Sequence, residues 1–179
     1  GGDYEKRTAG MRRYTGSDGG GNDVVYSAEK GGCIWLNEMV RGGKRGVDPV
    51  ADGGPEAREL LCGARDTNIA MERTLMGCTW TLPGYKRGNI PPGSSLVFER
   101  WRDKQSGKRW LHVYFQAQSL DDLRNLQSVD QAHPLLREEW RTPDCRVTEV
   151  GTLCPMASTL AKFGQQLDPT AITPISYAP

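Results

Sequence analysis

The stretch LLCGARDTN, residues 60–68, decides how the rest of the chain is interpreted. Residues 60–63 are mostly apolar and predict a short buried strand, which the polar residues 65–68 follow as a turn. Residues 67–78 then place apolar side chains at helical spacing, and Asp66 or Thr67 is the expected helix N-cap. Such a turn presents side chains at a strand end beside a helix N-terminus, which favours anions such as phosphate.

Composition excludes several classes of function. The chain has 179 residues, enough for one domain with a core, and a formal net charge of +1, so we expect no nucleic-acid partner and no attraction to acidic membranes. No run approaches the ~20 apolar residues of a membrane helix. No basic-then-apolar signal peptide opens the sequence. No Cys/His set has zinc-site spacing, so we expect no metal and no cofactor.

Residues 1–54 differ from the rest because glycines occur there in clusters, which raise the entropic cost of ordering the backbone. We interpret this Gly-rich segment as poorly ordered and without a recognised relative, and residues 55–179 as the domain. Two stretches in it, GSDGGG at 16–21 and RGGKRG at 41–46, could pass for a phosphate loop and an RGG-type nucleic-acid segment. Both lack the context that those mechanisms need, and a flexible linker is the preferred interpretation.

Downstream of the turn the sequence predicts a β-hairpin and two helices. Residues 96–102 and 110–116 alternate in polarity on either side of DKQSGK, which is the pattern of a hairpin. Ser119 is the expected N-cap of a short helix, and residues 156–167 are a final helix stopped by Pro169. Prolines at 134 and 143 indicate a loop between the two helices.

Four short motifs follow one another along the chain: DTN at 66–68, WTLPG at 80–84, PPGSSLVFERW at 91–101 and YFQAQSL at 114–120. This ordered set resembles the histidine acid phosphatases, and most closely their bacterial phytase-like branch. DTN is similar to the second half of that family's His-Asp-Thr-Asn motif, and the other three resemble the segments that follow it. Taken together, the resemblance covers roughly residues 60–166, the C-terminal part of such an enzyme.

The resemblance implies an α/β fold with part of a mixed sheet, flanking helices and a β-hairpin. It also implies hydrolysis of a phosphate monoester such as phytate. In that family a histidine attacks phosphorus, and the aspartate of the His-Asp pair protonates the leaving oxygen, which an alkoxide leaving group requires. Asp66 matches this catalytic acid; taken without the neighbouring motifs, it would be interpreted as a helix N-cap.

Two departures from the family bear on activity. Arg65 stands where the family has its phosphate-binding His, and Arg-His-Gly-x-Arg-x-Pro, which carries the nucleophile, is missing from the 179 residues. A guanidinium can still bind phosphate oxygens, so Arg65 is either a phosphate-binding residue or an unconstrained turn residue. We expect this chain to supply an acid-bearing half-site and to be inactive alone; the alternative is a non-catalytic binding or structural remnant.

The two histidines are expected to be structural, and two of the cysteines are expected to pair. His112 falls mid-strand and His133 in a loop, and neither is expected to be a nucleophile. Cys145 and Cys154 keep the family's spacing, so the resemblance implies a disulfide that holds the last helix near the hairpin, with reduced thiols as the alternative. The resemblance also implies a periplasmic or secreted location, where disulfides persist.

Overall fold

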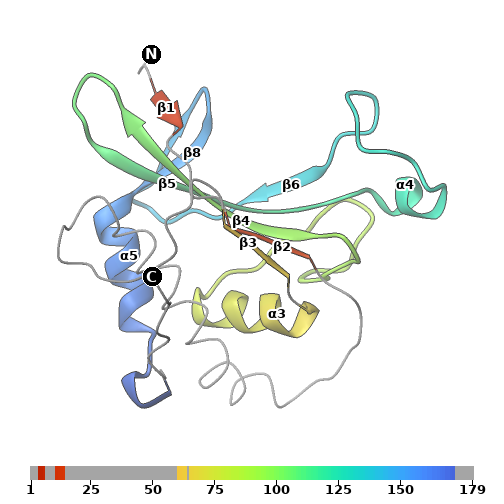
Figure 1. Cartoon of the computed structure of the whole chain (residues 1–179), viewed down its shortest axis with the longest axis horizontal. Helices are drawn as coiled ribbons and strands as arrows, with labels where there is room; N and C mark the ends of the chain where they lie inside the picture. Colours follow the sequence, from red (N-terminus) through yellow and green to blue (C-terminus); the bar gives the residue numbers. More distant parts are fainter. Residues whose placement is uncertain (1–3, 7–10, 15–59, 64, 172–179) are drawn as a thin grey trace, which may run out of the picture.

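The computed structural model describes residues 4–6, 11–14, 60–63 and 65–171, with side chains for residues 65–170. Its main sheet has six antiparallel strands in the order β1-β4-β5-β8-β7, and β6 pairs with β5 beside β8. Helices α3 and α5 lie together on one side of this sheet (Figure 1). The expected α/β fold with flanking helices and a hairpin is confirmed. Among the described helices none is long and apolar enough to cross a bilayer.

The centre of the sheet is the predicted hairpin, β4 (Ser95–Asp103) and β5 (Arg109–Ala117), paired antiparallel. The turn closes where Gly107 adopts a φ of +71°, a conformation that glycine reaches without steric cost. Because side chains alternate along a strand, one face of the hairpin is apolar and the other is largely polar. The apolar face carries Phe98, Val113 and Phe115, all buried.

Helix α3 (Asp66–Leu75) packs on the apolar face through Ile69, whose side chain is fully buried. Its predicted end at residue 78 is wrong, because Gly77 takes a φ of +60° and ends the helix. The Gly77 N–H donates to Thr74 O at 3.1 Å and the Cys78 N–H to Arg73 O at 3.0 Å, the pattern of a Schellman motif.

Helix α5 (Met156–Gln165) covers the other half of the apolar face. Its buried stripe is the predicted one, Met156, Leu160 and Phe163, and the Phe163 ring meets Phe98 edge-on with centroids 6.4 Å apart. Each such side chain contributes about 1.5–3 kcal/mol when it is fully buried. The helix therefore depends on tertiary packing more than on its own propensity.

The predicted disulfide between Cys145 and Cys154 is present, with Cα atoms 4.1 Å apart. Beside it, Asp144 accepts hydrogen bonds from Lys162 at 2.8 Å and Ser158 at 3.0 Å, and also from Thr142. The bond from Lys162, followed by those from the two hydroxyls, holds the pKa of Asp144 far below its usual range. The disulfide therefore fastens this loop to β8, and the Asp144 contacts with Ser158 and Lys162 fasten it to α5.

The region expected to be a loop contains three strands. They are β6 (Leu136–Glu139), β7 (Arg146–Thr148) and β8 (Gly151–Pro155). Helix α4 (Leu120–Arg124), which precedes them, has the predicted Ser119 cap. The loop prediction is wrong because these short strands lack polarity alternation and gain their hydrogen bonds from β5 or from each other. The pairing partner, and not the local sequence, makes them strands.

Two further strands lie near the N-terminus, where the sequence analysis expected none. β1 (Tyr4–Lys6) pairs antiparallel with β4, and β2 (Met11–Tyr14) pairs parallel with β3 (Leu60–Gly63), the strand predicted before the turn. β2 also lies against β4. The other residues of the Gly-rich segment, with Cys33, and the side chain of Cys62 are outside the described part of the chain.

Candidate active site

The candidate site lies where β3 meets α3. β3 ends at Gly63, Arg65 occupies the N-cap position, and Asp66 is the first helical residue. β2 runs parallel to β3, and its last residue, Tyr14, is the register partner of Gly63. The carboxyl ends of both strands therefore meet at one edge, beside the N-terminus of α3.

Hydrogen bonds within the turn fix its backbone. The Arg65 N–H donates to Asn68 Oδ1 at 2.9 Å, and the Asn68 N–H donates to the Arg65 carbonyl at 3.0 Å. A guanidinium has no acceptor and cannot cap a helix through its side chain. The expectation that Asp66 or Thr67 occupies the N-cap is wrong; Arg65 holds that position and Asn68 supplies the side-chain bond.

The two predicted site residues are adjacent but differ in exposure. Arg65 is exposed, whereas Asp66 is half-buried and its Oδ1 accepts the Thr67 N–H at 2.8 Å. The carboxylate thus lies at the positive end of the helix dipole, where negative charge is stabilised. An arginine at the same helix end can donate two parallel hydrogen bonds to an oxyanion.

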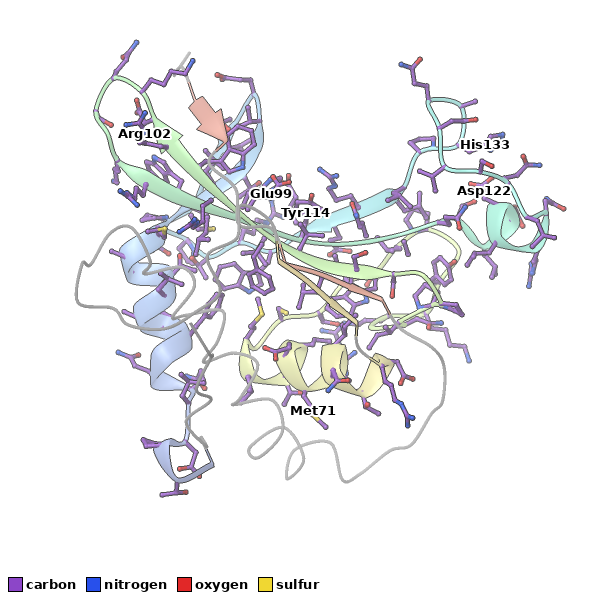
Figure 2. The ribbon with its side chains drawn as sticks, in the orientation of Figure 1. Met71, Glu99, Arg102, Tyr114, Asp122 and His133 are labelled. Carbon is purple, nitrogen blue, oxygen red and sulfur yellow. A yellow bond between two sulfur atoms is a disulfide. The ribbon has the colours of Figure 1, made fainter. Side chains whose placement is uncertain are left out.

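Neither histidine reaches this turn through any described contact. His112 is buried on β5 and bonded to two glutamates, so the expectation of a satisfied mid-strand histidine is confirmed. His133 follows α4, and its Nδ1 lies 2.8 Å from Asp122 Oδ1 (Figure 2). Ser119 Oγ also donates to Asp122, at 2.6 Å. The carboxylate lies between serine and histidine, so this histidine does not activate the hydroxyl as it does in a catalytic triad.

Cys78 is the other candidate nucleophile, and the acidic side chains, with His and Cys, are the candidate metal ligands. Cys78 is half-buried, and burial, partly offset by the Arg73 guanidinium, raises the pKa of its thiol to about 12. A thiol with such a pKa is a poor nucleophile, because the thiolate is the reactive form. Within the residues that the structure describes, no group of three or more His, Cys, Asp or Glu side chains is placed to hold a metal ion.

The family model described as "Histidine phosphatase superfamily (branch 2)" matches residues 21–116, more than half of the chain. This chain belongs to the histidine phosphatase superfamily, branch 2. The match begins inside the Gly-rich segment, where the sequence analysis finds no resemblance, and it includes the whole strand–turn–helix unit of the candidate site. The boundary between residues 54 and 55 stays a prediction.

Within this superfamily, the chain is similar to three phytases. The crystal structure of the Klebsiella sp. ASR1 phytase is 55% identical, with a TM-score of 0.78 over 88% of this chain and 38% of that one. The Hafnia alvei phytase in complex with myo-inositol hexakis sulphate is 30% identical, with a TM-score of 0.68 over 83% of this chain and 37% of that one. The phytase AppA of Escherichia coli (strain K12) is 31% identical over 98 residues, 55% of this chain and 22% of that protein. The chain thus spans less than half the length of each relative.

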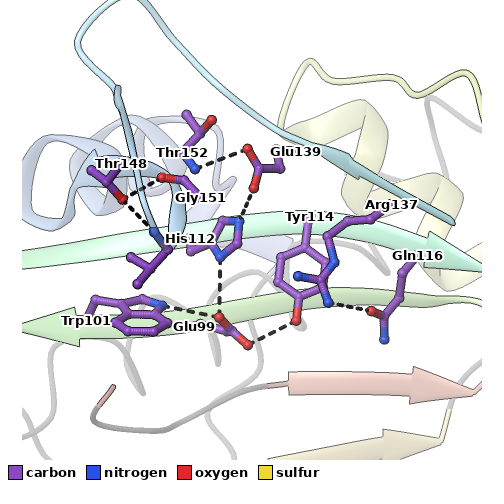
Figure 3. Close-up of polar contacts among 11 residues, drawn as sticks. Glu99, Trp101, His112, Tyr114, Gln116, Arg137, Glu139, Thr148, Gly151 and Thr152 are labelled. Atoms are coloured by element: carbon purple, nitrogen blue, oxygen red, sulfur yellow. Dashed lines mark hydrogen bonds and ion pairs between the residues drawn. The ribbon is translucent and has the colours of Figure 1, made fainter. Parts of the chain in front are cut away.

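The structure also shows a polar cluster that sequence reasoning missed. Glu99 on β4, His112 on β5 and Glu139 on β6 lie in contact on the face opposite the apolar core (Figure 3). The hairpin register makes Glu99 and His112 direct partners, so the loop length could have indicated that pair. Glu139 lies on an unpredicted strand, and no local signal brings it to His112.

Proposed function

We propose that this chain carries the acid-bearing half of a phosphomonoesterase site of the phytase type. Asp66 acts as the proton donor to the leaving oxygen, and Arg65 binds phosphate oxygens in place of a histidine. The observation that carries this proposal is the position of Asp66, which is the first residue of α3 and directly follows a strand–turn unit inside the segment matched by the family.

The geometry supports different roles for the two side chains, anion binding for Arg65 and proton donation for Asp66. The exposed guanidinium can reach an oxyanion at the helix N-terminus, while the half-buried carboxylate lies one residue further along the chain. For the phosphorus–oxygen bond to break, the departing alkoxide must receive a proton, and Asp66 is the acid available in this turn. The nucleophile that accepts the phosphoryl group comes from a His-bearing segment that is not among these 179 residues.

The substrate proposed is an inositol phosphate such as phytate. Three of the relatives are named phytases, and one of them was crystallised with myo-inositol hexakis sulphate. That compound is an inositol bearing sulphate groups, which share the charge and tetrahedral shape of phosphate. Because this chain covers only part of each relative, its substrate is a proposal about the intact enzyme type. The Cys145–Cys154 disulfide supports a periplasmic or secreted location.

A complementation assay tests the proposal. The chain is mixed with a phytase polypeptide that retains the Arg-His-Gly segment but carries an asparagine in place of its own catalytic aspartate. Hydrolysis of p-nitrophenyl phosphate and phytate is then followed at acid pH. We expect no turnover by the chain alone, measurable turnover in the mixture, and loss of that turnover with Asp66→Asn.

The matched control is Arg87→Ala, which removes an exposed arginine near the other end of α3 and should leave the mixture active. Turnover that persists in Asp66→Asn would show that Asp66 is not the acid. A mixture that folds and binds phosphate but never hydrolyses either ester would favour the alternative, a non-catalytic remnant of the fold.

A further inference from the structure

The polar face of the β4–β5 hairpin holds a histidine between two carboxylates. His112 Nδ1 lies 3.3 Å from Glu99 Oε2, and His112 Nε2 lies 2.7 Å from Glu139 Oε1 (Figure 3). The side chain of His112 is 2% exposed, that of Glu99 9% and that of Glu139 30%. Three ionisable groups from three strands thus share one largely water-excluded site.

The hydrogen-bond pattern requires an additional proton in this site. A neutral imidazole has one N–H donor, whereas an ionised carboxylate only accepts. With both ring nitrogens facing carboxylate oxygens, a neutral ring would point a lone pair at one of them. The geometry is satisfied when both nitrogens carry hydrogen or when one carboxyl is protonated.

The other contacts of the carboxylates place that proton on the ring. Glu99 also accepts from the Tyr114 hydroxyl at 3.0 Å and from Trp101 Nε1 at 3.2 Å. Glu139 accepts the Thr152 backbone N–H at 3.1 Å. Burial alone would raise the pKa of Glu139, but the hydrogen bonds from Thr152 and His112 hold it below its ordinary value. The contacts from Tyr114, Trp101 and Thr152 are all donated to the glutamates, which favours the ionised carboxylates.

Other charged groups border the cluster, because Arg137, Glu138 and Arg141 line one pocket with Glu139 and Thr152. On β6, the Arg137 guanidinium lies over the Tyr114 ring, 3.8 Å from its centroid, and donates to Gln116 at 3.3 Å. On β7 and β8 the residues facing the cluster are Thr148, Gly151 and Thr152, none of which ionises near neutral pH (Figure 3). An imidazole is the side chain whose charge ordinarily changes between mildly acid and mildly alkaline pH, and His112 is the imidazole that contacts both glutamates.

The cluster also holds the turn between β7 and β8. A Cβ added at Gly151 would come within 2.6 Å of Glu139 Oε1 and 2.7 Å of His112 Cε1, so this backbone lies directly against the cluster. From there β8 leads through Cys154 into α5. The cluster is thereby in contact with the strand that leads into the last helix.

We propose that Glu99, His112 and Glu139 form a proton-dependent clasp, which joins β4, β5, β6 and the β7–β8 turn while His112 is an imidazolium and releases that turn when His112 loses its proton. With a hydrogen on each ring nitrogen, the imidazolium can donate to both carboxylates, so the clasp contributes in acid. That contribution disappears as the pH rises above the range in which an imidazole ordinarily holds its proton, about 6.5. At very low pH it also fades, because the glutamates are then protonated.

The test compares urea unfolding of the full chain at pH 5 and pH 8.5. We expect the unfolding equilibrium constant of the wild-type chain to increase by roughly tenfold more over this interval than that of His112→Gln, the size of one charge-assisted hydrogen bond. His133→Gln is the matched control, because His133 has one carboxylate partner and a 39% exposed side chain, and it should keep the wild-type dependence. Equal pH dependence in His112→Gln and the wild type would overturn the proposal.

A second measurement on the unsubstituted chain covers the case in which His112→Gln does not fold. Nitrogen-15 NMR of the imidazole distinguishes a doubly protonated ring from either neutral tautomer. We expect both His112 nitrogens to carry hydrogen at pH 5, and the Gly151 and Thr152 amides to gain faster hydrogen exchange as the ring titrates. A neutral His112 at pH 5, or titration without any change at these amides, would refute the clasp.

Discussion

The turn at the start of α3 and the clasp on β4, β5 and β6 each contain a basic side chain and a carboxylate, but they are built in opposite ways. In the turn, Arg65 and Asp66 are neighbours in sequence, and the bonds that fix the backbone span at most three residues. In the clasp, Glu99 lies 13 residues and Glu139 lies 27 residues from His112. The first is open to a ligand and the second is shielded from water, so substitutions in the turn should affect binding and substitutions in the clasp should affect stability.

The largest effect on stability is expected for Gly151→Ala. The new Cβ would collide with Glu139 and His112, and residue 151 has a φ of +113°, which strains any residue with a side chain. We expect a loss of roughly 2–4 kcal/mol in the free energy of unfolding, measured by urea denaturation. Gly107→Ala is the control, because Gly107 also has a positive φ but no atom within 4 Å, and it should cost about 1 kcal/mol. Equal losses at the two glycines would show that the β7–β8 turn does not lie against the clasp.

The next effect concerns the disulfide that follows the clasp along β8. Replacing Cys145 and Cys154 by serine should lower the free energy of unfolding by roughly 2–3 kcal/mol on the chain-entropy model. The contacts of Asp144 with Lys162 and Ser158 remain, so the loop should stay near α5 in the folded state. Thermal unfolding with and without reductant measures the loss. A melting temperature that is indifferent to reductant would contradict the assigned pairing.

A smaller effect is expected in the turn. Asn68→Ala removes the acceptor of the Arg65 N–H and should cost about 1 kcal/mol in the free energy of unfolding. Thr67→Ala is the matched control, because the described contact of Thr67 is through its backbone N–H, and this change should stay within about 0.5 kcal/mol. If both variants unfold at the same urea concentration, Asn68 does not fix this turn.

The same contrast explains what the sequence could and could not predict. β3, the hairpin and the buried stripe of α5 follow from local patterns of apolar residues and form as expected. α3 also forms where such a pattern predicts a helix, but its cap and its last residue differ from the prediction. The strands β1, β2, β6, β7 and β8 lack such a pattern, and pairing with distant segments makes them strands. Asp66 could be assigned because its neighbours match a family motif, whereas the clasp depends on the register between β5 and β6. Local residues therefore predict the candidate site, and only the assembled sheet shows the clasp.

The central claim is that the turn at the start of α3 binds a phosphate-type anion through Arg65. A titration of the folded chain with inorganic phosphate, followed by amide NMR, tests it most directly. We expect saturable shifts at Arg65, Asp66 and Thr67, which Arg65→Ala removes while it changes the free energy of unfolding by no more than about 0.5 kcal/mol. Arg87→Ala, near the other end of α3, should leave the shifts in place. Shifts that are absent in the wild-type chain, or that survive Arg65→Ala, would contradict the claim.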